Sequence, residues 1–486
     1  MIRFLLEAIR QGILVGARQS KINLKPTTLE EALVVISQTA EIIVRLGKTI
    51  EDLTERLNLN SNNSSKPPST NVKNKKKQLD KCKKSGRKQG AQPGHKGTYR
   101  KLLPPEKVDQ FITCLPLEHC DCGGVVQVNN SNFQKHQVYE IPQPHYTVTE
   151  YQIFSGTCSC CNKQHNGHLP VGVTFKMFGA KTYALLAILT SKYRLSKRLA
   201  KKLLAELFSL PISVGSVSNI EARVSQAISA TYQEVQEVLK NEPIVHVDET
   251  SCKQSNKNGW LWVLTTMGLT LFLLSHSRGR KIAKELIGTY QDKVIVSDRY
   301  SSYNYISDRN RQVCWAHLKR NLQRISERSG VSGKLGRDLL KIYRKIFNIY
   351  STTTHEYRLN HNTTKKRLKK LIKKFENFLL DGLICGNNNT KNTCANIINV
   401  SGSLWTFLSN PKVEPTNNQA ERQLRPVVIW RKLSFGTQSN RGSRFVERIF
   451  TVTSTCIQQG KSALEFLQQA VTSYFSNCQP PRLLLV

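Results

Sequence analysis

Two short hydrophobic runs in the second half of the chain each end on an aspartate. Ile244, Val245 and Val247 precede Asp248, and a run at residues 294–296 leads to Asp298. Such runs predict buried β-strands, and open α/β sheets bind ligands at the carboxyl ends of their strands. The two aspartates are therefore predicted to lie at one sheet edge. A core strand that leads into a solvated acidic turn gives the same local pattern, and either run alone would favour that simpler interpretation.

The chain between these two runs predicts a hairpin and a helix. Residues 259–275 contain two apolar segments that a turn near Met267 and Gly268 separates. Residues 279–290 have the spacing of a short amphipathic helix. The predicted order is therefore strand, strand, strand, helix, strand.

A third acid, Glu421, lies far along the chain from both aspartates. Thr416 and Gln419 fit a helix capping box, which places Glu421 in the first turns of a helix. Two strand-borne aspartates and a helix-borne glutamate are a pattern for holding two hard divalent cations, about 3.5–4 Å apart, in phosphodiester chemistry. The residues between Asp298 and Glu421 have a helical and basic pattern, so we expect a helical insertion at about 319–412.

A heptad pattern near the N-terminus predicts a coiled-coil helix. Apolar residues recur every seven positions, and two leucines follow three residues after members of that series. The positions are Ile36, Ile43, Ile50 and Leu57, with Leu46 and Leu53. Either self-association through this seam or packing of one amphipathic helix on its own chain explains the pattern.

A polar and then strongly basic stretch follows this helix. Residues 58–71 are rich in Asn, Ser and Pro, and residues 73–88 are rich in Lys, which is typical of a linker and a charged arm. A solvated spacer is the simplest interpretation, and an arm that follows DNA phosphates is the alternative. The candidate phosphate-binding residues are Lys75, Lys76, Lys77, Arg87 and Lys88.

Clustered cysteines predict a zinc ribbon in the next segment. One turn carries two cysteines and a second turn carries three, with strand-like residues between them. We expect Zn²⁺ to be bound by Cys120, Cys122, Cys158 and Cys161, with Cys114, Cys160 and His119 as alternative ligands. The first pair has one residue between its cysteines where two are usual, so the ligand set stays open.

Residues 181–230 have a helical pattern with helix-turn-helix spacing. A turn at residues 209–213 separates two helices, and Ser213 fits the N-cap of the second. Ser216, Ser218 and Asn219 open the second helix with side chains small enough to approach DNA bases. A plain pair of packed helices has the same pattern.

Length and charge narrow the class of protein. The 486 residues suffice for several domains, and 72 Lys and Arg against 34 Asp and Glu give a net charge of +38 that favours polyanion binding. No run reaches the roughly 18 apolar residues of a membrane span. We therefore expect a cytosolic protein, associated with the nucleoid when it binds DNA, whose thirteen cysteines do not form disulfides.

Three blocks of the chain resemble signature blocks of the insertion sequence 66 family of DDE transposases. They read HVDET at 246–250, CWAHLKR at 314–320 and NNQAERQLRP at 417–426, and the linker phrases NSSKPPST and GAQPGHKG are similar as well. The strand order also resembles the RNase H-like core of DDE transposases and integrases. The resemblance implies that Asp248, Asp298 and Glu421 bind Mg²⁺ or Mn²⁺. The implied reaction is hydrolytic nicking at transposon ends, followed by attack of the freed 3′-hydroxyl on target DNA.

Basic side chains near these blocks are candidates for DNA contact. Arg422 and Arg425 flank the glutamate, and Arg425 is expected to steady its carboxylate or a phosphate. Arg431 lies in a segment with further Arg and Gly residues. His317 either contacts the scissile region or is a buried structural histidine, because no zinc-ligand partner is expected near it. Pro426 is expected to end or kink the helix.

Together these patterns predict a multidomain α/β protein. An RNase H-like mixed sheet with helices and a helical insertion is preceded by a coiled-coil helix, a zinc-ribbon-like domain and a helix-turn-helix-like domain. The expected spans are 1–60 for the N-terminal helix, 61–104 for the basic linker, 105–172 for the zinc domain, 173–240 for the helical domain, 241–455 for the catalytic domain and 456–486 for a C-terminal helix and tail. The expected partners are double-stranded DNA, further copies of the chain and small accessory transposition proteins, with no membrane.

Two other functions compete with transposition. A regulator that binds DNA without chemistry, such as a degenerate transposase copy, would not need all three acids. A structure-specific nuclease would use the same core without strand transfer, and it would not need modules that recognise a particular DNA end.

Overall fold

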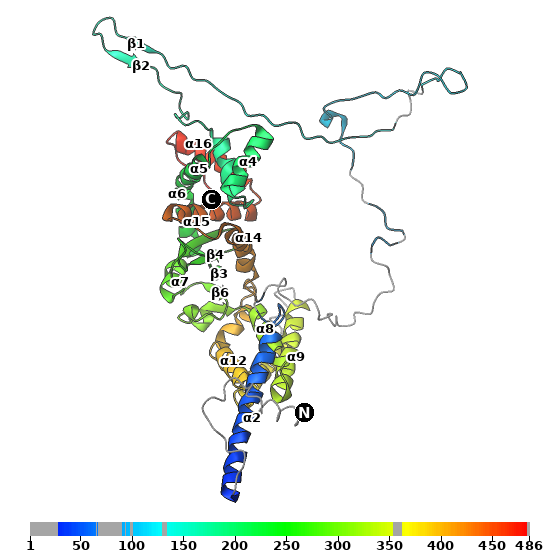
Figure 1. The fold of residues 1–486 in the computed structure, drawn as a ribbon, viewed down its shortest axis with the longest axis vertical. Helices are drawn as coiled ribbons and strands as arrows, with labels where there is room; N and C mark the ends of the chain where they lie inside the picture. The colour runs from blue at the N-terminus through cyan, green and yellow to red at the C-terminus, as the bar shows by residue number, and fades with distance from the viewer. Residues whose placement is uncertain are drawn as a thin grey trace.

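The computed structural model describes residues 28–64, 66, 90–92, 94–97, 101–128, 134–352 and 362–483. At its centre is a five-stranded mixed sheet with helices packed around it, which confirms the predicted mixed α/β class (Figure 1). The strands are β3 (Ile244–Ser251), β4 (Trp260–Thr265), β5 (Thr270–Ser275), β6 (Val294–Ser297) and β7 (Arg311–Val313). They lie in the order β5-β4-β3-β6-β7.

The strands nearest the two aspartates have the predicted connections. β3, β4 and β5 pair antiparallel through short connections, whereas β6 pairs parallel to β3, and β7 parallel to β6. Parallel pairing requires a crossover, which the predicted helix α7 (Arg280–Ile287) supplies. Val245, Val247 and Ile295 are fully buried, because elements cover both faces of the central strands.

The main hydrophobic core is shared by the sheet and by helices that precede and follow its strands in the sequence. They are α3 (Ala180–Thr190), α4 (Lys197–Phe208), α5 (Val214–Ala227), α6 (Ser229–Asn241), α14 (Asn418–Ser434), α15 (Asn440–Gln458) and α16 (Ala463–Phe475). Helix α16 lies within the span 456–486, where the sequence predicts a C-terminal helix. Helix α14 runs on through Pro426, so this proline does not end the helix, and the expectation that it kinks the helix stays a prediction.

Helix α15 covers the free edge of strand β5. Three of its side chains, four residues apart, each accept a hydrogen bond from an N–H group of β5, and the three N–H groups are two residues apart. The pairs are Leu274 with Glu447 (2.7 Å), Phe272 with Thr451 (3.0 Å) and Thr270 with Thr455 (3.2 Å). The spacing matches because four helical residues rise about 6 Å and two strand residues about 6.6 Å. The helix thus satisfies an edge that otherwise invites strand pairing.

A second hydrophobic core is formed by helices that lie between β7 and α14 in the sequence, where a helical insertion is predicted. Its helices are α8 (Trp315–Ser326), α9 (Gly330–Thr352), α11 (Asn362–Asp381), α12 (Asn388–Ile398) and α13 (Thr406–Ser409). The fully buried Trp315 donates its indole N–H to the Leu404 carbonyl at 2.7 Å. Its ring centroid lies 5.6 Å from that of Phe375 and 4.9 Å from that of Trp405. Short 3₁₀ turns, η3 (Ser301–Tyr303), η4 (Asp308–Asn310) and η5 (Ser401–Leu404), connect these parts.

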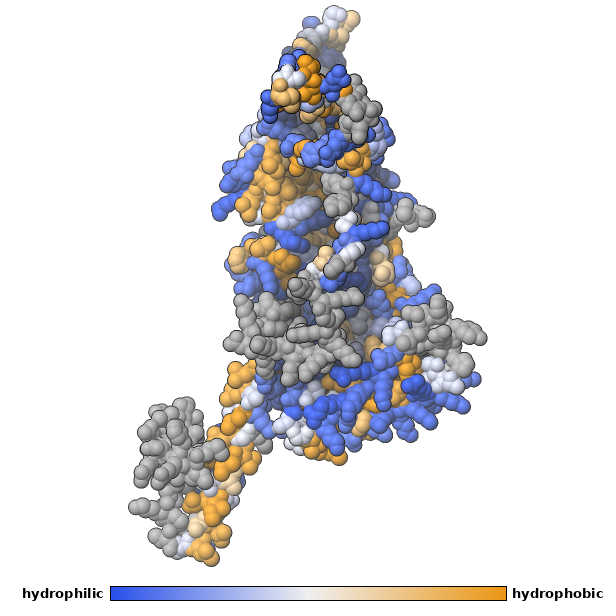
Figure 2. Space-filling model, turned by 90° about the vertical axis from the view of Figure 1, so that its right-hand side faces the viewer, coloured by the Kyte–Doolittle hydropathy of each residue, from blue (hydrophilic) through white to orange (hydrophobic). Residues whose placement is uncertain are grey.

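The predicted N-terminal helix is α2 (Leu29–Leu57). Near its end, Glu55 forms ion pairs with Arg324 and, at 2.8 Å, with Arg328, so α2 is anchored to the second core. Along its length α2 carries exposed apolar side chains, visible in orange in Figure 2: Leu29, Leu33, Val34, Ile36, Ile43, Val44, Ile50, Leu53 and Leu57. An exposed apolar surface of this length fits contact with another helix, and self-association through it stays a prediction.

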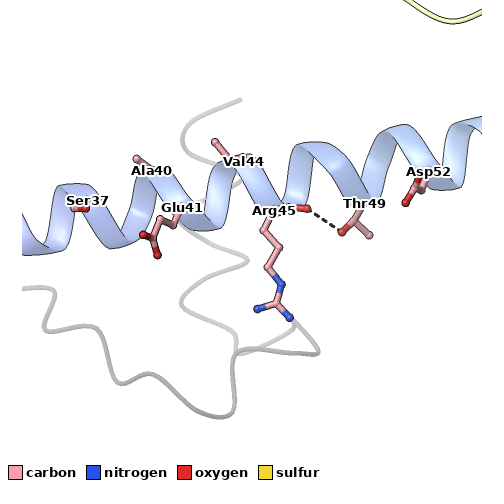
Figure 3. A pocket seen from close by; sticks show the side chains of 7 residues that line it. All are labelled: Ser37, Ala40, Glu41, Val44, Arg45, Thr49 and Asp52. Carbon is pink, nitrogen blue, oxygen red and sulfur yellow. Dashed lines mark hydrogen bonds between the residues drawn. The ribbon is translucent and has the colours of Figure 1, made fainter. Parts of the chain in front are cut away.

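A groove on α2 is lined, as far as the described residues go, by side chains of that helix (Figure 3). Within it the Thr49 hydroxyl donates to the Arg45 carbonyl at 2.9 Å. Charged and small side chains follow one another along the helix and do not converge on a common point. The groove is therefore not a candidate catalytic site.

The segment before α3 is extended. In its described part, residues 101–128 and 134–175, it contains the 3₁₀ turn η2 (Pro105–Lys107) and a two-stranded sheet of β1 (Ser155–Thr157) and β2 (Gln164–Asn166), and most side chains are exposed. Among the described helices of the chain, none is long and apolar enough to cross a membrane.

The edge contact of Glu447 predicts a pH dependence of stability. Burial raises the pKa of Glu447 from 4.5 to about 7, although the N–H of Leu274 and the charges of Arg448 and Arg444 lower it. A carboxyl with a higher pKa in the folded state stabilises the fold at low pH and loses this contribution as the pH rises through about 7. Glu447→Gln keeps an acceptor oxygen and removes the titration. We therefore expect its free energy of unfolding to fall less between pH 4.5 and 7 than that of the wild type.

The difference between the two proteins should reach about 3 kcal/mol at most. Denaturant unfolding across this pH range measures it. Glu285→Gln, at an exposed position of α7, is the matched control and should follow the wild type. Parallel curves for Glu447→Gln and the wild type would contradict the assignment.

Candidate active site

The register of the sheet places Asp248 beside Asp298. In the parallel pair β3–β6, Ile244 lies opposite Val294 and His246 opposite Val296. Continued by two residues, this register sets Asp248 level with Asp298. Equivalent positions on adjacent parallel strands point to the same face of a sheet. Both aspartates therefore reach the same face at the same edge.

Helix α14 brings Glu421 to these aspartates. Glu421 lies in the first turn of this helix. Asn417, the residue just before the helix, is its N-cap and is fully buried. The Asn417 amide donates to the Val247 carbonyl at 2.8 Å and accepts a hydrogen bond from the His246 ring at 3.2 Å. The start of the glutamate helix is thereby fixed to the strand residue just before Asp248.

The capping box predicted from Thr416 and Gln419 does not form. The N-cap is Asn417, whose side chain makes no cap hydrogen bond within its own helix. The Gln419 amide instead donates to the Thr266 carbonyl at 3.0 Å. Tertiary contacts with the sheet therefore replace the local contacts that the sequence predicts.

The charges of Asp298 and Glu421 both act on Asp248. Burial raises the pKa of Asp248 well above its usual range, and the charges of Glu249, Asp298 and Glu421 raise it further, against one stabilising N–H bond from Glu249. A nearby negative charge raises the pKa of a carboxyl because it disfavours ionisation. The aspartate of β3 is thus influenced by both acids that the sequence pairs with it.

The three acids fit a hard divalent cation in the chemistry of their ligand atoms. All offer carboxylate oxygens, which Mg²⁺ and Mn²⁺ prefer. One oxygen of Asp248 accepts the Glu249 N–H and one of Asp298 accepts the Tyr300 N–H, both at 2.8 Å, while Oε1 of Glu421 is buried without a hydrogen-bond partner. Among the described residues, no three carboxylates have oxygens within 4.8 Å of one another, so the acids are grouped more loosely than direct ligation requires.

His317 lies beside Glu421, which the sequence did not predict. His317 is on α8, and its Nδ1 is 3.7 Å from Oε1 of Glu421. The thiol of Cys314 lies within the same 4.8 Å group of ligand atoms. The expectation that His317 has no metal-ligand partner nearby is therefore wrong. Burial lowers the pKa of His317, although the charges of Glu421 and Asp298 raise it.

Sequence reasoning missed Glu249, which follows Asp248 on β3. Its side chain is 0% exposed, and its carboxylate accepts hydrogen bonds from Arg278 Nε at 2.9 Å and from the Tyr303 hydroxyl. The Arg278 guanidinium also lies 3.8 Å from the centroid of the Tyr300 ring. Strand alternation turns Glu249 away from the Asp248 face, and an acid buried there needs a cationic partner. That need was the available signal, but Arg278 is too distant in sequence to be identified from it.

The predicted arginines of α14 lie outside this cluster. Arg422 donates to Oε1 of Gln419 on the same helix at 3.0 Å, and Arg431 donates to the hydroxyl of Ser251 on β3 at 2.8 Å. Arg425 is exposed, and among the ion pairs of the described residues it has none with Glu421. The glutamate faces His317 instead.

The helix-turn-helix prediction is confirmed at the level of its two helices, α4 and α5. Ser213 is the N-cap of α5 and accepts the Ser216 N–H at 3.0 Å. Ser218 accepts a hydrogen bond from Lys197 at 2.9 Å, and Lys197 also forms an ion pair with Glu221. Asn219 is exposed. Whether this pair reads DNA stays a prediction.

The predicted zinc ligands form two separate turns. N–H groups of Cys122 and of Cys161 point at the sulfurs of Cys120 and Cys158 and lower their pKa values. Within the part of the chain that the structure describes, no three of these thiols lie within 4.8 Å, so the turns are not joined around one point. The phosphate-binding candidates Lys75, Lys76, Lys77, Arg87 and Lys88 lie outside the described residues.

Comparisons with known proteins match the part of the chain that contains these residues. The family model described as "Transposase IS66 family" matches residues 176–444, which include the three acids, Cys314 and His317. A family of unknown function (DUF6444) matches residues 20–101. The uncharacterized protein y4qI of Sinorhizobium fredii (strain NBRC 101917 / NGR234) is 23% identical over 267 residues, which are 49% of this chain and 48% of that protein. The chain thus spans about half the length of this relative.

The hydrogen bonds of Asn417 predict a large effect on stability. Asn417→Leu leaves the Val247 carbonyl and the His246 ring N–H buried without their partner, which we expect to cost about 2–4 kcal/mol of the free energy of unfolding. Asn418→Leu, one residue later at an exposed position, is the matched control and should change stability by less than about 0.5 kcal/mol. Denaturant unfolding compares the two. Similar losses in both variants would contradict the role of Asn417.

Proposed function

Because this chain belongs to the IS66 family of transposases, we propose that it cuts DNA at transposon ends and transfers the cut strand to target DNA, with Asp248, Asp298 and Glu421 as the metal-binding acids. The family match covers residues 176–444 and not the whole chain, so both the cleavage step and the strand-transfer step belong to the proposal. The observation that carries the proposal is the meeting of the three acids at one sheet edge. There, Asp298 and Glu421 both raise the pKa of Asp248.

The chain's own residues divide the work at this edge. Backbone N–H groups hold one oxygen each of Asp248 and Asp298, which leaves the second oxygen of each aspartate for a ligand. Glu421 adds a carboxylate from the first turn of α14, a helix fixed by Asn417. When Mg²⁺ or Mn²⁺ is bound by these acids, it supplies Lewis-acid activation of the attacking oxygen and charge stabilisation of the leaving oxygen.

Several parts of the chain support DNA binding in this proposal. The net charge of +38 favours association with a polyanion through counterion release. Arg425 is exposed on the helix that carries Glu421 and is available to a phosphate near the scissile bond. We assign end recognition to the two cysteine turns, with Zn²⁺, and to the α4–α5 pair, and non-specific contact to the basic arm. Self-association through α2 and a need for accessory proteins are part of the same proposal.

Cleavage of a labelled duplex that carries the ends of the encoding element tests the function. With Mg²⁺ or Mn²⁺, the wild type should nick the duplex at the end sequence. Asp248→Asn should reduce the nicking rate by about 10³-fold or more while DNA binding persists, because the variant loses a carboxylate at the metal site but no DNA contact.

Asp292→Asn is the matched control. It removes the same charge from an exposed position before β6, close in sequence to Asp298, and should keep wild-type cleavage. Wild-type protein that binds the ends tightly and does not cut them would contradict the proposal and favour a DNA-binding protein without chemistry. Cutting of any duplex regardless of its end sequence would favour a nuclease.

A further inference from the structure

The ligand atoms of Cys314, His317 and Glu421 face one another at the start of α8. They lie within 4.8 Å of one another, and no other such group of three metal-ligating side chains occurs among the described residues. Nδ1 of His317 and Oε1 of Glu421 are both buried and both lack a hydrogen-bond partner. Two buried polar atoms without partners, 3.7 Å apart, are too far from each other for a good hydrogen bond. Their burial therefore calls for a third species between them.

The surroundings of Cys314 suit a metal-bound thiolate. Cys314 is fully buried at the N-cap of α8, and its sulfur accepts the Asn417 N–H at 3.1 Å. Burial raises the pKa of the Cys314 thiol above its usual value, whereas the backbone N–H groups of Asn417, His317 and Ala316, which point at this sulfur, lower it. N–H groups directed at a sulfur stabilise its negative charge, and the thiolate is the form that binds metal.

We propose that Cys314, His317 and Glu421 bind a borderline-soft transition-metal ion such as Zn²⁺, separate from the Mg²⁺ or Mn²⁺ of the catalytic acids. Sulfur and imidazole ligands select zinc-class ions and disfavour Mg²⁺, which prefers oxygen. In a tetrahedral site with the usual bond lengths, nitrogen and oxygen ligands are about 3.4 Å apart, so the observed 3.7 Å requires only a small contraction. Three protein ligands leave a fourth position for water.

Such an ion would fix the orientation of the glutamate helix. Glu421 would give Oε1 to the zinc-class ion and keep Oε2 for the site of the two aspartates. The bond would tie α14 to α8 in addition to the hydrogen bond between Asn417 and Cys314. Cys314 and His317 are thus positioning residues for Glu421, and this part of the inference rests on the proposed function. The metal site itself does not, because its test needs no DNA.

Cobalt spectroscopy tests the site in the full chain. Co²⁺ replaces Zn²⁺ and reports thiolate ligation through a sulfur-to-cobalt charge-transfer band. The predicted zinc-ribbon cysteines and their alternatives, Cys114, Cys120, Cys122, Cys158, Cys160 and Cys161, are first replaced by Ser to remove their signal. We expect this protein to bind one equivalent of Co²⁺ with a charge-transfer band, which Zn²⁺ abolishes and millimolar Mg²⁺ does not.

Three further substitutions in this background decide the ligands. Cys314→Ser should abolish the band, and His317→Gln should weaken Co²⁺ binding at least about tenfold. Cys394→Ser, at another fully buried cysteine in the second core, is the matched control and should keep both band and affinity. His317 is partly exposed, so its variant tests the site even if Cys314→Ser fails to fold.

Absence of a charge-transfer band in the background protein would overturn the site. A band that persists in a folded Cys314→Ser protein, or an unchanged affinity in His317→Gln, would overturn it as well. Because the readout is the metal–sulfur bond, these results are independent of whether the protein cuts DNA.

Discussion

The candidate site depends on a short chain of buried hydrogen bonds centred on Asn417. The Asn417 side chain donates to the carbonyl of Val247, the residue before Asp248. Its backbone N–H donates to the sulfur of Cys314, whose own N–H donates to the carbonyl of Ser297, the residue before Asp298, at 2.8 Å. Asn417 itself precedes Glu421 by one helical turn. Three hydrogen bonds thus set the relative positions of all three acids, although these come from distant parts of the sequence.

This rigid frame holds together charges that repel one another. The sheet fixes the two aspartates at the same level, and α14 is fixed against the strand that carries the first of them. Burial and like charges then raise the pKa of Asp248, since the carboxylates are not free to move apart. A bound cation relieves this repulsion directly. A frame that costs stability without its ligand is common at functional sites, where neighbouring structure sustains the strain.

Local patterns in the sequence were sufficient for the elements and for the grouping of the acids. The hydrophobic runs before Asp248 and Asp298 predicted the strands, and their shared register follows from parallel pairing. The N-cap of α14 was predicted wrongly, because its side chain is used in tertiary contacts that no local pattern records. The pairing of His317 with Glu421 and of Glu249 with Arg278 was missed for the same reason. Partners far apart in the sequence become identifiable only when the sheet and helices are in place.

Iron-mediated cleavage of the polypeptide tests whether Asp248, Asp298 and Glu421 together hold one cation. Fe²⁺ is added in place of Mg²⁺, with ascorbate and peroxide, so that radicals formed at the bound ion cut the nearby backbone. If the three acids share one cation, we expect cuts at three separate segments, around residues 248, 298 and 421, that excess Mg²⁺ suppresses and that Asp298→Asn removes together. Cuts confined to one of these segments, or cuts that persist in Asp298→Asn, would contradict a shared site.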